Sequence, residues 1–261
     1  MDDPEPIHPP RINILGVGVH ALNMPLSLKL IDEAIHAKRK GYITVTGVHG
    51  IMEAQHDDAL RSIFNHSFLT TPDGMPTVWL GRAQGQPDMQ RVYGPDLMME
   101  LCAASVQKGY RHFLYGGNDG VAGDLQMALE ARFPGLQVVG TFTPPFRPLN
   151  PEEEADLKAQ VSQAQPDICW IGLSTPKQER FMAEYLPKLD VTLMAGVGAA
   201  FDIHTGRMKE APRWMMKCGL QWLQRMMQEP RRLAGRYLVN NPKFVFKSLC
   251  QLAKLKKYSL D

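Results

Sequence analysis

Hydrophobic and polar positions alternate along the chain in two periods. Short apolar runs, rich in β-branched and aromatic residues, predict strands over 12–19, 42–48, 68–71, 111–115, 136–142, 167–173 and 191–197. Between them, apolar positions at helical spacing predict helices over 24–40, 51–65, 94–108, 121–132, 151–164 and 177–186. This alternation is typical of right-handed βαβ units. We therefore predict a Rossmann-like α/β fold, with a mainly parallel sheet and helices on both of its faces.

Charge divides the chain into two parts. Residues 205–261 contain thirteen Lys or Arg and three Asp or Glu, a net charge of +10, whereas residues 1–204 have a net charge of −8. A basic segment on an acidic body indicates contact with an anionic partner: phospholipid, nucleic acid or a phosphate-bearing substrate. The sequence thus predicts an α/β body over 1–204 and a basic helical appendage over 205–261.

Composition limits the cellular compartments in which the protein is expected. The four cysteines share no metal-type spacing, which indicates a reducing environment. Residues 1–6 are acidic and proline-rich, unlike a signal peptide. No uninterrupted apolar stretch reaches the roughly 18 residues that a membrane span needs. We therefore expect a cytoplasmic protein, or one peripheral on the cytoplasmic face of a membrane.

The candidate ligand-binding residues follow the ends of the predicted strands. In parallel sheets, ligands bind beyond the carboxyl ends of the strands. Two of these ends are glycine-rich, at Gly116-Gly117 and at Gly196-Val197-Gly198, where bare backbone N–H groups can accept a phosphate. A tight turn explains Gly116-Gly117 equally well. Both interpretations of this pair stay open.

Asp73 lies in the glycine-flanked segment Pro72-Asp73-Gly74 after a predicted strand. There the carboxylate can face a cleft and act as a general base, although a helix-cap role is also consistent with it. The segment beginning at Pro176-Lys177 can likewise be a simple helix start. The sequence has no Asp-x-Asp element, Walker A loop or Gly-x-Ser-x-Gly elbow, and its histidines share no ligand spacing. We predict neither a metal site nor a cofactor.

Several motifs occur together in a specific order. They are Thr46-Gly47-Val48, Pro72-Asp73-Gly74-Met75-Pro76, Arg91-Val92-Tyr93-Gly94-Pro95-Asp96-Leu97, Phe113-Leu114-Tyr115-Gly116-Gly117, Pro176-Lys177-Gln178-Glu179, Gly196-Val197-Gly198 through Asp202, and Gly219-Leu220-Gln221-Trp222 through Arg231-Arg232. Over about residues 12–240 the chain resembles the WecG/TagA/CpsF glycosyltransferases (glycosyltransferase family 26).

The resemblance implies an inverting, metal-independent transferase. Such enzymes move a sugar from a UDP-sugar to a saccharide on undecaprenyl diphosphate, in the synthesis of bacterial cell-surface or exopolysaccharides. It implies that Asp73 is the general base and that Thr46, Arg91 and Gln178 share the catalytic site. The expected substrate-binding residues are Gly74, Gly116, Gly117, Lys177, Glu179, Gly196, Gly198, Asp202, Arg225, Arg232 and Arg236.

Two positions depart from the commoner family pattern. Thr46-Gly47-Val48 replaces Thr-x-Asn, and Leu173-Ser174-Thr175 stands before the proline in place of Gly-Ala. The donor sugar therefore stays open among N-acetylmannosamine, N-acetylmannosaminuronate, glucose and similar hexoses.

The appendage arginines fit a leaving diphosphate. Without a metal, the charge that develops on the diphosphate needs cationic side chains. Arg225, Arg232 and Arg236 have spacings that would share one helix face, unless Pro230 breaks the helix. Residues 243–257 further predict an amphipathic helix, with lysines on one side and apolar residues on the other, suited to an anionic membrane surface. Packing on protein is the alternative, and a homo-oligomer stays open.

Two other classes of function make different predictions. A nucleic-acid-binding protein would use the basic tail to grip the phosphate backbone, but it leaves the motif around Asp73 unexplained. A non-catalytic sugar-nucleotide or lipid-binding scaffold would tolerate the loss of Asp73. We therefore expect a glycosyltransferase that does not bind nucleic acid.

Overall fold

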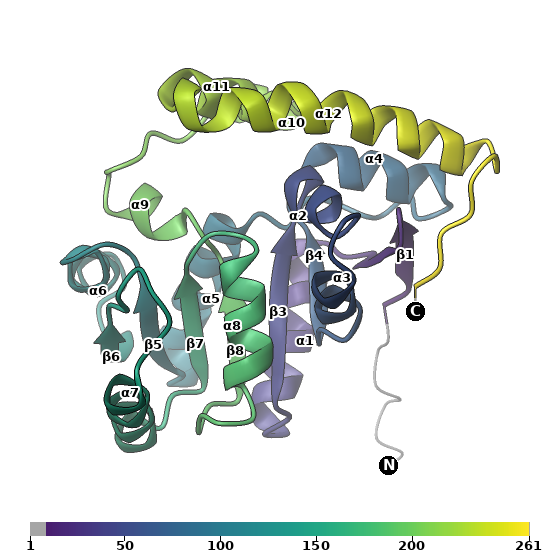
Figure 1. Ribbon diagram of the computed structural model, residues 1–261. Helices are drawn as coiled ribbons and strands as arrows, with labels where there is room; N and C mark the ends of the chain where they lie inside the picture. Colours follow the sequence, from purple (N-terminus) through teal and green to yellow (C-terminus); the bar gives the residue numbers. More distant parts are fainter. Residues whose placement is uncertain (1–8, 261) are drawn as a thin grey trace, which may run out of the picture.

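A computed structural model describes residues 9–260; the acidic segment 1–6 lies outside this range. The centre of the fold is a six-stranded parallel sheet in the order β4-β3-β8-β7-β5-β6 (Figure 1). The strands are β3 (Gly41–Thr46), β4 (Leu69–Pro72), β5 (Arg111–Gly116), β6 (Gln137–Phe142), β7 (Ile168–Gly172) and β8 (Leu193–Gly196). The predicted Rossmann-like architecture is confirmed.

Helices cover both faces of the sheet. One face packs on α1 (Met24–His36), α5 (Gly94–Lys108), α6 (Val121–Arg132) and α9 (Ala200–His204). The other face packs on α7 (Pro151–Ala164) and α8 (Lys177–Tyr185). In β7, Trp170 points into the first core and Ile171 into the second, and both are fully buried. Because both faces are covered, these strands are apolar throughout and do not alternate with polar residues.

The predicted strand over 12–19 is wrong as one sheet strand. It forms a separate antiparallel hairpin of β1 (Arg11–Ile14) and β2 (Val17–His20). Leu15 and Gly16 both have positive φ values, of 53° and 87°. Two consecutive residues of this kind make the two-residue turn whose twist matches a hairpin. The hairpin packs beside β4, where the His20 ring accepts a hydrogen bond from the Thr70 backbone N–H at 2.9 Å.

The single helix predicted over 51–65 is also wrong. The chain forms α2 (Val48–Glu53) and α3 (Asp58–Asn65), because the Asp57 carboxylate accepts a hydrogen bond from Leu60 N at 2.9 Å and starts a new helix. The helix α4 (Met75–Ala83), directly after Asp73 and Gly74, was not predicted.

A helical layer, α10–α12, crosses over the carboxyl ends of the strands (Figure 1). It consists of α10 (Arg213–Lys217), α11 (Gln221–Gln228) and α12 (Pro230–Leu252). The prediction of a helix over 243–257 is wrong for its last five residues. Lys254 has a φ of 59°, which ends the helical path, and the chain turns back toward the hairpin. There Asn13 donates a hydrogen bond to the Tyr258 carbonyl at 2.7 Å.

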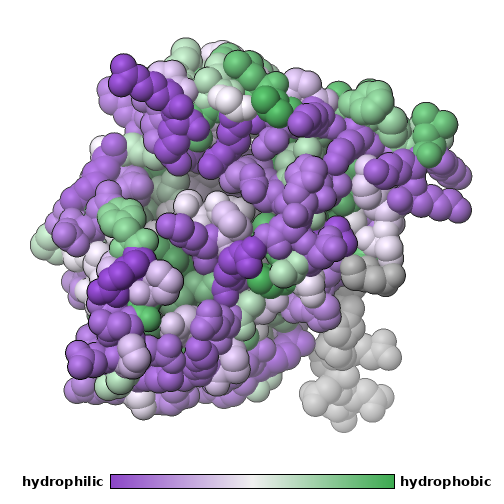
Figure 2. Space-filling view, viewed as in Figure 1, coloured by the Kyte–Doolittle hydropathy of each residue, from purple (hydrophilic) through white to green (hydrophobic). Residues whose placement is uncertain are grey.

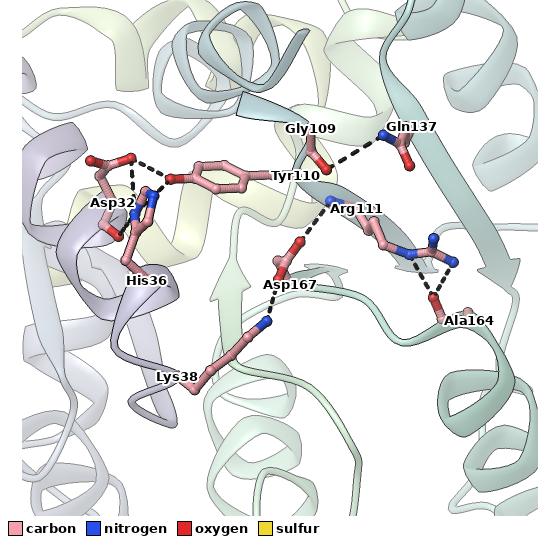
Figure 3. Close-up of polar contacts among 9 residues, drawn as sticks. All are labelled: Asp32, His36, Lys38, Gly109, Tyr110, Arg111, Gln137, Ala164 and Asp167. Carbon is pink, nitrogen blue, oxygen red and sulfur yellow. Dashed lines mark hydrogen bonds and ion pairs between the residues drawn. The ribbon is translucent and has the colours of Figure 1, made fainter. Parts of the chain in front are cut away.

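The opposite end of the sheet is held by a polar network (Figure 3). The Asp167 carboxylate accepts hydrogen bonds from the Arg111 backbone N–H and from Lys38 Nζ, each at 3.0 Å. The Arg111 guanidinium donates to the Ala164 carbonyl. These bonds join neighbouring elements at the amino ends of the strands, so this end is structural and leaves the carboxyl edge for ligands.

Among residues 9–260, no helix combines the length and the apolar character that crossing a membrane requires.

Candidate active site

A large cavity lies between the carboxyl edge of the sheet and the α10–α12 layer. Its volume is about 890 Å³. The loops that follow β3, β4, β7 and β8 line one side, and α11 and α12 line the other. The cavity therefore joins motifs separated by nearly the whole described chain.

Asp73 and Thr46 lie next to each other in this cavity. The Asp73 backbone N–H donates a hydrogen bond to the Thr46 carbonyl at 2.9 Å, which fixes the turn after β4 against the end of β3. Gly47 lies beside this turn, since a Cβ there would be in ordinary contact with it, 3.8 Å from Asp73 Oδ2 and 3.6 Å from Gly74 N. Thr46 Oγ1 and Asp73 Oδ1 are buried atoms without a hydrogen-bond partner in residues 9–260. Two polar oxygens are thus available for a ligand.

The surroundings of Asp73 make its carboxylate a better proton acceptor. Burial raises its pKa above the ordinary value, while Arg91 and Arg225 oppose that rise. Arg91 Nη2 lies 3.9 Å from Asp73 Oδ1, and Arg91 Nε donates a hydrogen bond to the Asp73 carbonyl. The side chain of Asp73 keeps 33% of its surface exposed. A carboxylate with a raised pKa and an open side has the properties of a general base.

The α11 helix is bonded directly to this edge of the cavity. Gln221 accepts a hydrogen bond from Arg91 Nη2 and donates one to the Tyr93 hydroxyl at 2.8 Å. The Arg91 guanidinium also stacks over the Tyr93 ring, 4.0 Å from its centroid. One residue of the α10–α12 layer therefore helps to position the arginine beside Asp73.

Three arginines of α11 and α12 meet in the cavity. Although the helix breaks at Glu229-Pro230, both Arg225 and Arg232 line the cavity, as does Arg236. Burial and the neighbouring Arg232 lower the pKa of Arg236. Arg225 Nε is buried and has no hydrogen-bond partner in the described part of the chain. An excess of positive charge with unsatisfied donors is the signature of an anion site.

His49 faces the same charged region. Burial lowers its pKa to about 4, and the charges of Arg236, Arg225 and Arg232 add to the effect. The imidazole is therefore neutral near pH 7. A neutral ring can exchange hydrogen bonds with a sugar or phosphate oxygen without adding charge.

Gln178 lies beneath the last strand end. It is 3% exposed, and a Cβ at Gly196 would lie 3.1 Å from its amide group. Its Nε2 donates to Glu179 Oε1 at 3.0 Å, and Thr175 Oγ1 donates to the same oxygen at 2.9 Å. Burial raises the pKa of Glu179. The glycine thus leaves space for Gln178 at the floor of the cavity.

The predicted site residues fall into two groups. Those that line the cavity are Thr46, Asp73, Gly74, Arg91, Gln178, Gly196, Gly198, Asp202, Arg225, Arg232 and Arg236. Four predicted binding residues are outside this lining: Gly116, Gly117, Lys177 and Glu179. At Gly116, which has a φ of 127°, a Cβ would lie 2.7 Å from the Gly172 backbone, so close strand packing alone explains this glycine.

His49, Gln221 and Trp79 also line the cavity but were not among the predicted site residues. His49 follows the unusual Thr46-Gly47-Val48 segment, and that departure from the family pattern was the available signal. Gln221 lies within the Gly-Leu-Gln-Trp motif, but its contact with Arg91 depends on how α11 packs. Trp79 carried no signal, because the helix α4 was not predicted.

Within residues 9–260, no group of three or more His, Cys, Asp or Glu side chains is arranged to hold a metal ion.

A sheet with a carboxylate at one strand end and a cationic cluster above it is the type of site that suits group transfer from a phosphate-bearing donor. Residues 12–258 match the model of the glycosyl transferase WecG/TagA/CpsF family. The chain belongs to this family and is a glycosyltransferase.

Two relatives carry the same functional name, N-acetylglucosaminyldiphosphoundecaprenol N-acetyl-beta-D-mannosaminyltransferase. The protein from Bacillus spizizenii is 26% identical over 209 residues, which cover 80% of this chain and 79% of that relative. The protein from Bacillus subtilis is 26% identical over 170 residues, 65% of this chain and 64% of that relative.

Proposed function

We propose that the protein transfers a sugar from a UDP-sugar to a saccharide carried on undecaprenyl diphosphate, with inversion and without a metal. One observation carries the proposal: Asp73 Oδ1, which has no hydrogen-bond partner in residues 9–260, shares a cavity with the arginine cluster of Arg225, Arg232 and Arg236. The two relatives act on an N-acetylglucosaminyl-diphosphoundecaprenol acceptor by name. The site supplies a base for such an acceptor and a cationic region for a leaving nucleotide.

In this mechanism the Asp73 carboxylate takes the proton of the acceptor hydroxyl while that oxygen bonds to the anomeric carbon. The bond from the anomeric carbon to the diphosphate oxygen breaks, and its electron pair leaves with UDP. Arg225, Arg232 and Arg236 stabilise the charge that develops on UDP. Arg91 lies beside Asp73 and orients it through its bond to the Asp73 carbonyl.

The donor sugar is proposed to be recognised by the two segments that depart from the family pattern. Gly47, Val48 and His49 line the cavity, as do Ser174 and Thr175. The donor is N-acetylmannosamine, N-acetylmannosaminuronate, glucose or a similar hexose. The proposed location is the cytoplasmic face of the bacterial inner membrane, where a soluble nucleotide sugar meets a lipid-linked acceptor.

The assay is transfer from UDP-N-acetylmannosamine, UDP-N-acetylmannosaminuronate and UDP-glucose to a short-chain polyprenyl diphosphate saccharide. We expect one donor to give a product with inverted anomeric configuration, measured by NMR. EDTA should leave the rate unchanged, because the cationic cluster replaces a metal. Absence of transfer from every UDP-sugar would overturn the proposal. A rate that falls in EDTA and returns with Mg²⁺ would overturn its metal-independent part.

The protein is also proposed to bind anionic membranes through the surface of α12. On α12, Phe246 is 69% exposed and lies between Lys243 and Lys247 in the sequence, and Leu255, just after the end of the helix, is 79% exposed. Lysines near anionic headgroups contribute about 1 kcal/mol each, and salt screens this attraction but not apolar insertion. Binding to vesicles with phosphatidylglycerol should therefore exceed binding to neutral vesicles and weaken in salt. Phe246→Glu with Leu255→Glu should remove the salt-resistant part in a sedimentation assay. Equal binding to both kinds of vesicle would contradict the electrostatic contribution.

The alternative functions predict different outcomes in the same assays. A non-catalytic scaffold would bind UDP-sugar and release no UDP in the presence of acceptor. A nucleic-acid-binding protein would show salt-dependent affinity for DNA or RNA. The Asp73 oxygen that has no hydrogen-bond partner within residues 9–260 lies inside the cavity and favours catalysis over both.

A further inference from the structure

The cavity continues from the charged site into a groove between α4 and α12. The α4 wall consists of Trp79, Leu80 and Ala83, and the α12 wall of Phe244, Val245, Leu249 and Leu252. The polar residues of α12 in this part of the lining are Asn241 and Ser248. The groove is therefore mostly apolar, in contrast to the arginine-rich end of the same cavity.

Several apolar side chains of the groove stay largely exposed within residues 9–260. Trp79 is 48% exposed, Val245 55% and Leu249 60%. Figure 2 shows hydrophobic side chains at the surface along the upper edge of the molecule, where Figure 1 places α12. Contiguous exposed apolar surface beside a polar site marks a place where a ligand or partner binds.

Both helices begin near the charged end of the cavity and end near its apolar end. The α4 helix starts at Met75, two residues after the proposed base Asp73. The α12 helix carries Arg232 and Arg236 near its start, and its apolar wall extends from Phe244 to Leu252, about 12 Å at 1.5 Å per residue. Both helices therefore lead away from the reacting groups toward an apolar end. An amphiphile with a charged, sugar-bearing head and an apolar chain has the matching order of groups.

We propose that this groove binds the isoprene units nearest the diphosphate of the lipid-linked acceptor. The inference rests on the proposed function, since it needs a polyprenyl diphosphate acceptor. The groove is continuous with the cavity of Asp73, so an isoprene chain bound in it would place its diphosphate and saccharide beside the proposed base. This continuity favours the isoprene chain over a second copy of the protein or a membrane surface. The groove positions the acceptor saccharide by holding its lipid.

The direct test measures binding of farnesyl diphosphate and of inorganic diphosphate by calorimetry. The wild-type protein should bind farnesyl diphosphate at least tenfold more tightly, because each buried methylene adds favourable transfer free energy. Val245→Gln with Leu249→Gln should reduce that affinity to the level of inorganic diphosphate. Leu249→Met, which keeps volume and apolar character, should retain it. Equal affinities of the wild-type protein for the two probes would overturn the proposal.

Steady-state kinetics distinguish binding of the lipid in the groove from binding of the protein to a membrane. The acceptors carry one saccharide on either a single isoprene unit or several, without vesicles. The Val245→Gln, Leu249→Gln double variant should raise KM for the longer acceptor at least tenfold and leave the KM for the shorter acceptor and for the donor unchanged. Phe246→Gln is the matched control, since Phe246 is 69% exposed on the same helix and outside the cavity lining. It should behave as wild type in this vesicle-free assay, where the proposed membrane contact of Phe246 plays no part.

The outcomes distinguish this inference from the function on which it rests. A wild-type protein that transfers sugar with no dependence on chain length overturns the groove and leaves the function standing. Equal loss in the groove variant and in Phe246→Gln, seen only with vesicles, assigns the surface to the membrane and overturns the groove. Absence of transfer to every acceptor overturns the function itself.

Discussion

Replacing Asp73 by Asn should lower kcat by a factor on the order of 10²–10⁴ while UDP-sugar binding stays nearly unchanged. The amide keeps the shape of the side chain but cannot take the proton of the acceptor hydroxyl. The structure supports this expectation, since Asp73 Oδ1 has no hydrogen-bond partner in residues 9–260 and its one ion pair there, with Arg91 Nη2, is long at 3.9 Å. Steady-state kinetics with saturating acceptor, together with calorimetric binding of UDP-sugar, give the two required numbers.

The pH profile provides an independent check. Burial raises the pKa of Asp73 above its ordinary value of 3.8, and the base must be deprotonated to act. Activity should therefore fall as pH decreases through the raised pKa, and the same acidic limb should be absent from the residual rate of Asp73→Asn. Wild-type turnover in Asp73→Asn would show that another group is the base.

Arg225→Ala should lower kcat by a factor on the order of 10²–10³ and raise the donor KM much less, because the diphosphate charge grows in the transition state. Arg225 gives the clearest test of the cluster, since its Nε is buried and has no hydrogen-bond partner within the described residues. Arg232, by contrast, is already paired with Glu229, at 2.5 and 2.7 Å. Initial-rate kinetics over a range of UDP-sugar concentrations separate kcat from KM.

Arg231→Ala is the matched control for the arginine cluster. Arg231 has the same charge, lies next to Arg232 on α12, is exposed and does not line the cavity. Its loss should leave both constants within the error of the assay. If Arg225→Ala and Arg231→Ala had the same small effect, the basic layer would act only through its overall charge.

Most of the sheet could be predicted from the sequence because burial on both faces leaves continuous apolar runs. The runs around Trp170 and Leu193 became β7 and β8 with their bounds nearly unchanged. The hairpin was missed because Leu15-Gly16 interrupts one apolar run without a polar residue. Periodicity detects the run, but the positive φ of two residues decides that it folds back.

The end of α12 shows a second limit of periodicity. Lys254 and Lys257 fit the lysine row of a continuous helix, but local caps and contacts decide where a helix ends. At Lys254 the chain leaves the helix, and the last residues bond to the hairpin and to α3, where Asn65 donates to the Leu260 carbonyl. These contacts join residues 195 positions apart, so no local pattern could indicate them.

The sequence by itself determined the α/β class, the strand ends that carry Thr46, Asp73 and Gly196, and the excess of basic residues after residue 204. These features depend on local periodicity, turn chemistry and charge. Only the tertiary structure decided that Arg225 and Asp73 meet in one cavity, that Gln221 binds Arg91, and that α4 and α12 form an apolar groove beside them. Such contacts depend on how separate helices pack over the sheet, and packing geometry is not written in the spacing of any single segment.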